Sequence, residues 1–139
     1  MMSSPSRLQR LRFSLALSSM AICAPALTGQ PFAPTPTEIR ALPDACRVRL
    51  DQGTKAEWEA YQAKLGRPIW DHLHHFCYAM NFMNRQVSEL HKPTRRNQLE
   101  QAINNYDYVL ARWPKDHPLY KEAAMGKRQA EIYLQMVKL

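Results

Sequence analysis

The chain has 139 residues and a formal net charge of +7 at pH 7, with 45% hydrophobic and 22% charged residues. This length allows one domain, and the composition is that of a folded protein rather than a disordered one. The sequence contains four glycines and three cysteines, and it has no glycine-rich nucleotide loop, serine-hydrolase elbow or four-cysteine zinc motif. These composition limits exclude several common enzyme classes.

The first 26 residues have the layout of a secretory signal peptide. A basic stretch is followed by an apolar run over residues 13–23 and by a cleavage site after Ala26. The basic residues are Arg7, Arg10 and Arg12. An apolar run of 11 residues is too short to span a bilayer well. We therefore predict export to the periplasm by the general secretory route, followed by removal of residues 1–26.

Two alternatives exist for this leader. Cys23 could carry a lipid, although the bulky Ile22 before it differs from the small residue that lipoprotein signals have there. The leader could also be retained as an N-terminal anchor. Cleavage would leave 113 residues with a net charge of +4 and no run of five like charges, so we expect no nucleic-acid partner and no stable membrane span.

Removal of the leader also leaves two cysteines, Cys46 and Cys77. An even number of cysteines in an oxidising compartment usually means a disulfide. We predict a bond between them, which would fasten a short, weakly apolar segment to the most apolar helix of the chain. Two separate buried thiols are the alternative.

The mature chain begins with a stretch typical of a linker. Residues 27–36 contain three prolines and a glycine and are expected to be flexible. A single helical domain is predicted over residues 37–139. Capping boxes, Thr35 with Glu38 and Thr54 with Glu57, predict the starts of two helices; the first is short, and a second short helix is predicted over 43–50.

Helical spacing of apolar residues continues through the rest of the chain. The segment after Thr54 should end at Gly66, with Trp58 and Tyr61 in the core. Residues 69–90 are apolar nearly all round, which indicates a central helix. Further helices are predicted over 94–113, capped by Thr94, and over 118–139. No alternating strand pattern occurs, so we predict an all-α fold of about five helices.

In the helix predicted over 94–113, the spacing of apolar residues indicates which side faces the core. Ala102 is predicted to face a neighbouring helix, whereas Asn104, Asn105 and Asp107 are expected to face solvent. In the last helix, Gly126 lowers helix propensity and is expected to permit close packing.

The spacing of Ala102, Tyr106, Val109 and Pro114 resembles the second helix of a tetratricopeptide repeat. Two registers fit the first helix of such a repeat: His75, Tyr78-Ala79 and Phe82, or Leu73, Phe76-Cys77 and Met80. Tyr120 and Ala123-Ala124 resemble the start of another repeat, although Lys127 stands where an aromatic residue is expected. The resemblance covers about residues 69–139, and the connection from Phe82 to Ala102 is longer than in the family.

The resemblance implies antiparallel helix pairs behind a non-repeat N-terminal cap, with a groove that binds a peptide segment or helix of another envelope protein. The polar residues expected to line that groove are Asn81, Arg85, Lys121 and Lys127. The fold would then act by binding, without catalysis and without a cofactor. An ordinary five-helix bundle is the alternative fold.

A histidine cluster gives an alternative function. His72 and His75 are one helical turn apart and could share a transition metal, as in a small periplasmic metal- or haem-handling protein. The competing interpretation is a polar first turn on a buried helix. No acid is placed to orient a His–Cys pair, and we expect no enzyme.

Overall fold

The computed structural model describes residues 30–138, which form helices and contain no strand. The long helices are α5 (Leu73–Ser88), α6 (Lys92–Leu110) and α7 (Pro118–Lys138). The shorter elements are α1 (Pro36–Arg40), α2 (Asp44–Arg47), the irregular turn η1 (Val48–Gln52), α3 (Lys55–Leu65) and α4 (Arg67–Trp70). The prediction of an all-α fold is confirmed. The predicted signal peptide, including Cys23, lies outside the described residues.

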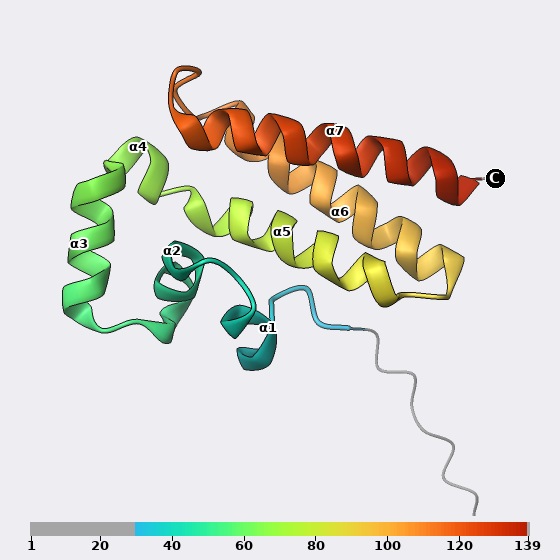
Figure 1. The fold of residues 1–139 in the computed structure, drawn as a ribbon, viewed down its shortest axis with the longest axis horizontal. Helices are drawn as coiled ribbons and strands as arrows, with labels where there is room; N and C mark the ends of the chain where they lie inside the picture. The colour runs from blue at the N-terminus through green and yellow to red at the C-terminus, as the bar shows by residue number, and fades with distance from the viewer. Residues whose placement is uncertain (1–29, 139) are drawn as a thin grey trace, which may run out of the picture.

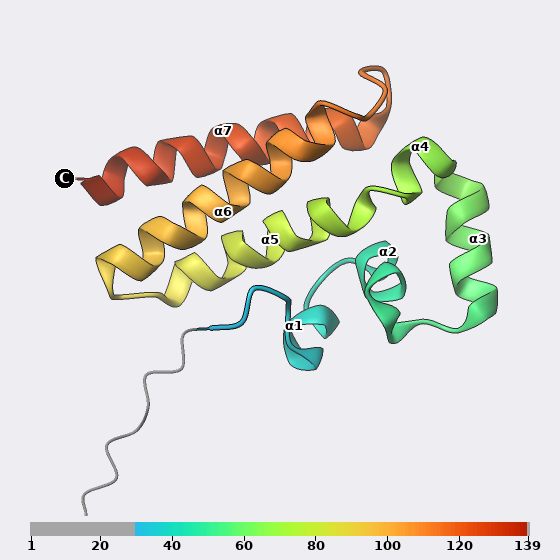
Figure 2. The same cartoon turned by 180° about the vertical axis from the view of Figure 1, so that it is seen from behind.

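The three long helices form an antiparallel row with α6 in the middle (Figure 1). α6 packs on α5 on one side and on α7 on the other. The N-terminal elements lie on the far side of α5, and the reverse view shows the same order (Figure 2). Within residues 30–138, no helix combines the length and the apolar character that a membrane crossing requires.

Both predicted capping boxes are formed. The Thr35 hydroxyl accepts from the Glu38 N–H, and the Glu38 carboxylate accepts from the Thr35 N–H. Thr54 and Glu57 repeat the arrangement at the start of α3. Each box pairs N–H groups that a helix leaves without intrahelical acceptors.

α6 begins two residues earlier than the predicted first residue. His91 is its N-cap residue and Pro93 lies in its first turn, so Thr94 is inside the helix instead of capping it. Proline is tolerated there because the N–H groups of the first turn have no acceptor within the helix, so the N–H that proline lacks is not missed. The His91 ring nitrogen Nδ1 lies 2.8 Å from the Thr94 hydroxyl.

The predicted cysteine pair is found in the core. The sulfurs of Cys46 in α2 and Cys77 in α5 are 2.09 Å apart and their Cα atoms 5.5 Å apart, which is disulfide geometry. Both residues are buried, with 1% and 0% of their surface exposed. The pair fastens the N-terminal elements to the middle of α5.

Gly126 lies where α7 packs tightly against a side chain of α6. A Cβ atom at this position would lie 2.5 Å from Cζ and 2.6 Å from the hydroxyl oxygen of Tyr106. The ring of Tyr106 therefore occupies the space that any other residue would fill, as expected from the sequence. Burial also raises the pKa of Tyr106 to about 12.

Two sequence-based placements are wrong. Trp58 is 36% exposed and lies edge-on to Trp70 of the core, at 5.2 Å between ring centroids. α3 has no buried residue, because it covers one end of the fold instead of entering it. Asn105 is only 5% exposed: α6 is covered on two sides, so its buried surface is wider than a single apolar stripe. Asn104 and Asp107 are exposed, as expected.

Candidate functional site

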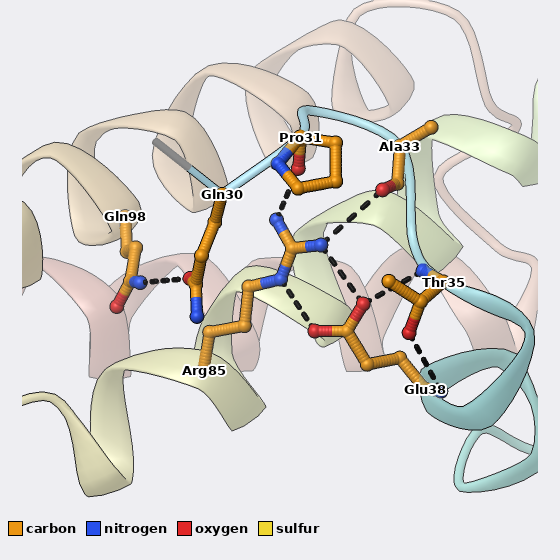
Figure 3. A network of polar contacts seen from close by, with 7 residues as sticks. All are labelled: Gln30, Pro31, Ala33, Thr35, Glu38, Arg85 and Gln98. Carbon is orange, nitrogen blue, oxygen red and sulfur yellow. Dashed lines mark hydrogen bonds and ion pairs between the residues drawn. The ribbon is translucent and has the colours of Figure 1, made fainter. Parts of the chain in front are cut away.

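A buried arginine on α5 is the centre of the candidate site. The Arg85 side chain is 4% exposed, and its guanidinium donates to both carboxylate oxygens of Glu38, at 2.6 and 2.9 Å. It also donates to the backbone carbonyls of Pro31 and Ala33, at 2.6 and 3.2 Å (Figure 3). The rigid fork of N–H groups suits several acceptors in one plane. Arg85 thus holds both α1 and the segment before it.

That segment, residues 30–35, is called here the strap. It bends at Phe32 and Ala33, so that its carbonyls face the guanidinium (Figure 3). The Gln30 side-chain oxygen accepts from the Gln98 amide at 2.8 Å. The Phe32 ring lies edge-on to Tyr78 and Phe82, with centroids 5.4 and 5.2 Å away. The described part of the expected linker is therefore held against α5 and α6.

The strap lies along α5 in what we call the α5–α6 cleft. α6 borders the cleft at the Gln30 end, whereas α1 and η1 border it at the Ala33 end, and an open hollow adjoins each end. A hollow of about 350 Å³ adjoins Gln30 and is bounded by Phe82, Arg85 and Gln98. Another, of about 410 Å³, adjoins Ala33 and Pro34. The strap therefore fills only part of the available space.

Two buried amide groups in the cleft keep an unsatisfied atom. Nδ2 of Asn81 and Oε1 of Gln98 have no hydrogen-bond partner within the described residues, although the residues are only 1% and 4% exposed. An unsatisfied buried polar atom typically costs about 1–3 kcal/mol. Nδ2 of Asn81 is a donor and Oε1 of Gln98 is an acceptor. A peptide group has both a C=O and an N–H, so a bound main chain could pair with atoms of either kind.

The ion pair at the centre is charged at neutral pH. The hydrogen bond from Arg85 is the largest of the causes that lower the pKa of Glu38 to about 2, and bonds from Thr35 act in the same direction. The carboxylate therefore neutralises the guanidinium locally. The cleft presents paired charges and aromatic surface rather than an isolated positive charge.

The second hollow has a different lining. Arg49 and His74 border it, with Nη2 of Arg49 3.3 Å from Nδ1 of His74. Burial is the main cause that lowers the pKa of His74 to about 4, so this imidazole is neutral at pH 7 and accepts from Arg49. Asp51, also in the lining, has a left-handed backbone with φ of 66°, which aspartate adopts more readily than most residues.

The structure brings together only two of the four expected groove residues. Asn81 and Arg85 lie in the cleft but are buried, and Arg85 is already engaged by the strap and Glu38. Lys121 is exposed on α7. Lys127, also on α7, pairs with Asp107 at 2.6 Å and Glu131 at 3.6 Å, and the Asp107 hydrogen bond is the main cause that raises its pKa.

Sequence reasoning missed the residues that complete the cleft: Gln30, Phe32, Glu38 and Gln98. From the sequence, Glu38 has a role only in the capping box with Thr35. The one available signal was Phe32, a large aromatic residue between two prolines in an otherwise small or polar stretch.

The histidines proposed as metal ligands contact residues of α6. Nδ1 of His72 lies 3.4 Å from the Tyr108 hydroxyl. The His75 ring stacks on Tyr108 with centroids 3.7 Å apart, and its Nδ1 lies 2.8 Å from Oδ1 of Asn105. Across residues 30–138, no three His, Cys, Asp or Glu side chains are grouped so that they could hold a metal ion.

Comparison of the sequence and structure with family models, curated proteins and solved structures gives no match.

Proposed function

We propose that this chain is an exported, periplasmic protein–protein interaction module, whose α5–α6 cleft binds a segment of another envelope protein. The observation that supports it best is Arg85, a buried cation that donates to main-chain carbonyls of a non-helical segment. Hydrogen bonds from a charged donor are stronger than neutral ones, and binding through the main chain is a recurrent way to recognise peptides. The Cys46–Cys77 pair agrees with an oxidising compartment.

We further propose that α5, α6 and α7 are a tetratricopeptide-like helix pair and the first helix of another. In α6, Ala102 is 0% and Tyr106 4% exposed, as the small and aromatic positions of such a repeat would be. The N-terminal elements would then be the cap. In this proposal the protein acts by complementarity, without catalysis or a cofactor.

The metal- or haem-handling alternative has less support. His72 and His75 contact Tyr108 and Asn105 in α6, so a metal would have to displace existing contacts. Elemental analysis of untagged protein from the periplasm distinguishes the two functions. A stoichiometric transition metal that is lost in His72→Ala or His75→Ala would favour the alternative.

Site-specific photo-crosslinking tests the interaction module. A photoreactive residue replaces Asn97, which is exposed at the rim of the 350 Å³ hollow, and the control replaces Glu59, which is exposed on α3. After irradiation of intact cells, we expect a discrete adduct with one envelope protein from position 97 and none from position 59. Adducts of equal yield at both positions, or none at position 97, would contradict the proposal.

A further inference from the structure

We propose that the partner of the α5–α6 cleft is a neutral, bent, non-helical peptide segment with an aromatic side chain, and that the strap occupies its place in the absence of the partner. This inference rests on the proposed function, since it names the chemistry of the segment that the cleft receives.

The contacts of the strap show what the cleft can recognise. Arg85 donates to the carbonyls of Pro31 and Ala33, which flank Phe32. Neither bond involves a side chain of the strap, so any segment with the same bend presents the same carbonyls. The Phe32 ring lies against the Tyr78 and Phe82 rings, and edge-on aromatic contacts of this kind are favourable beyond the area they bury. The main chain sets the bend, and the aromatic residue sets the register.

The strap is an incomplete ligand. Phe32 remains 50% exposed, and Pro31 has no N–H to donate. Asn81 and Gln98 line hollows that adjoin Gln30, and the buried atoms Nδ2 of Asn81 and Oε1 of Gln98 are without partners among the described residues. A segment with an ordinary residue in place of Pro31 offers one more donor. That donor is the group that the buried acceptor Oε1 of Gln98 lacks.

Tethering explains why the strap fills the cleft nevertheless. A segment in the same chain competes at an effective concentration that reaches the millimolar range for short linkers. A partner segment must therefore make better contacts than the strap, which the two unsatisfied amide atoms permit.

The charges in the cleft favour a neutral segment. Arg85 already faces the Glu38 carboxylate at 2.6 Å, so an acidic segment would be repelled by Glu38 as much as attracted by Arg85. Carbonyl oxygens carry only partial charge and fit beside the ion pair. We therefore assign the cleft to a neutral main chain rather than to an acidic peptide.

Peptide binding tests this directly. The probe is a fluorescein-labelled peptide of sequence QAFAPT, which is the strap with alanine in place of its first proline. The proteins are the mature chain and its Phe32→Ser variant, in which the strap loses its aromatic contact. Fluorescence anisotropy should show at least tenfold tighter binding to Phe32→Ser. A QASAPT peptide should bind neither protein measurably.

Two further variants locate the binding, each made in the Phe32→Ser background. Arg85→Lys keeps the charge but removes the fork, and Gln98→Leu keeps most of the volume but removes the unsatisfied acceptor. Each should weaken QAFAPT binding about tenfold. Circular dichroism establishes that each variant is folded, and Gln98→Leu keeps the test decisive if Arg85→Lys does not fold.

Several results would overturn the inference. The first is that QAFAPT binds the mature chain and Phe32→Ser with equal affinity, or does not bind folded Phe32→Ser at all. The second is that Gln98→Leu leaves QAFAPT binding unchanged. The third is that the acidic peptide QDFEPT binds more tightly than QAFAPT. A dimer of the mature chain that Phe32→Ser abolishes would instead assign the cleft to the strap of a second copy. If the peptide fails while the Asn97 crosslink persists, this inference is wrong and the interaction module stands.

Discussion

The Nδ1 atom of His75 on α5 lies 2.8 Å from Oδ1 of Asn105 on α6. The Asn105 amide nitrogen donates in turn to the carbonyl of Gln101 at 2.8 Å. Because a carbonyl oxygen can only accept, Nδ1 of His75 is the donor in this bond. This side-chain bridge joins the two central helices, and the 5% exposure of Asn105 is compatible with its polarity because both ends of its amide are paired.

Asn105→Leu should destabilise the protein by about 1–3 kcal/mol, because it leaves the His75 N–H without its acceptor in a half-buried site. This reverses the expectation from sequence, which placed Asn105 in solvent. Urea unfolding measures the change. Asn104→Leu is the matched control, since Asn104 is exposed and surface substitutions usually change stability by less than about 0.5 kcal/mol. Equal effects at 104 and 105 would contradict the bridge.

Gly126→Ala should destabilise despite the better helix propensity of alanine. The substitution gains about 1 kcal/mol of propensity, but its Cβ would lie 2.5 Å from Cζ of Tyr106. Overpacking of this kind costs about 1–3 kcal/mol, and contact with a buried ring leaves little room to relax. We expect a net loss of about 1 kcal/mol in thermal or urea unfolding.

The control for this prediction is Gln129→Ala, at an exposed position of α7, which should be neutral or slightly stabilising. In a Tyr106→Leu background the Gly126→Ala substitution should no longer destabilise, because the clashing ring is gone. A stabilising effect of Gly126→Ala alone would mean that α7 lies farther from α6 than the structure shows.

The pair of Glu38 and Arg85 should make stability depend on pH in the acid range. The pKa of Glu38 is lowered from 4.5 to about 2, so the folded state binds this proton less readily than the unfolded state. The resulting stabilisation is present above about pH 4.5 and is lost as the pH falls toward 2. Glu38→Gln should therefore destabilise by roughly 1–2 kcal/mol at pH 7, after allowance for solvent screening, and by much less near pH 2.

Urea unfolding at a series of pH values measures this difference. Glu59→Gln is the control, because Glu59 is exposed and its nearest cation, Lys55, is 3.6 Å away on the same helix. Its effect should be small throughout the range. A difference between wild type and Glu38→Gln that does not change with pH would argue against a charged Glu38 in the folded protein.

Local features of the fold could be predicted from sequence. The capping boxes at Thr35 and Thr54 need residues three positions apart only, and they form as predicted. Gly126 was identifiable because a glycine inside an apolar helix needs a packing reason. The pairing of Cys46 with Cys77 is predictable by counting cysteines outside the predicted signal peptide, and the structure brings the two together. In each case the relevant residues are few and the physical rule is local.

The cleft could not be predicted, because it depends on how elements distant in sequence meet. Arg85 and Pro31 are 54 positions apart, and Gln98 and Gln30 are 68 apart. A polar residue outside the apolar stripe of a helix gives the same sequence pattern whether solvent or another segment of the chain covers it. Asn105 was misplaced for the same reason, since only the arrangement of α5, α6 and α7 shows that α6 is covered on two sides.

The Cys46–Cys77 pair should contribute a large part of the stability. It closes a loop of 31 positions, for which the chain-entropy estimate is roughly 3–4 kcal/mol. In addition, Cys46 is one of few buried residues that attach α2 to the core. Cys46→Ala and Cys77→Ala should each lower the melting temperature by roughly 10–20 °C, measured by circular dichroism without reductant. The double variant should match either single variant, because all three lack the same bond.

Thiol alkylation provides an independent test of the bond. Alkylation of the denatured, unreduced protein should label neither Cys46 nor Cys77. Labelling of both residues, or additive losses of stability in the double variant, would show two independent buried thiols.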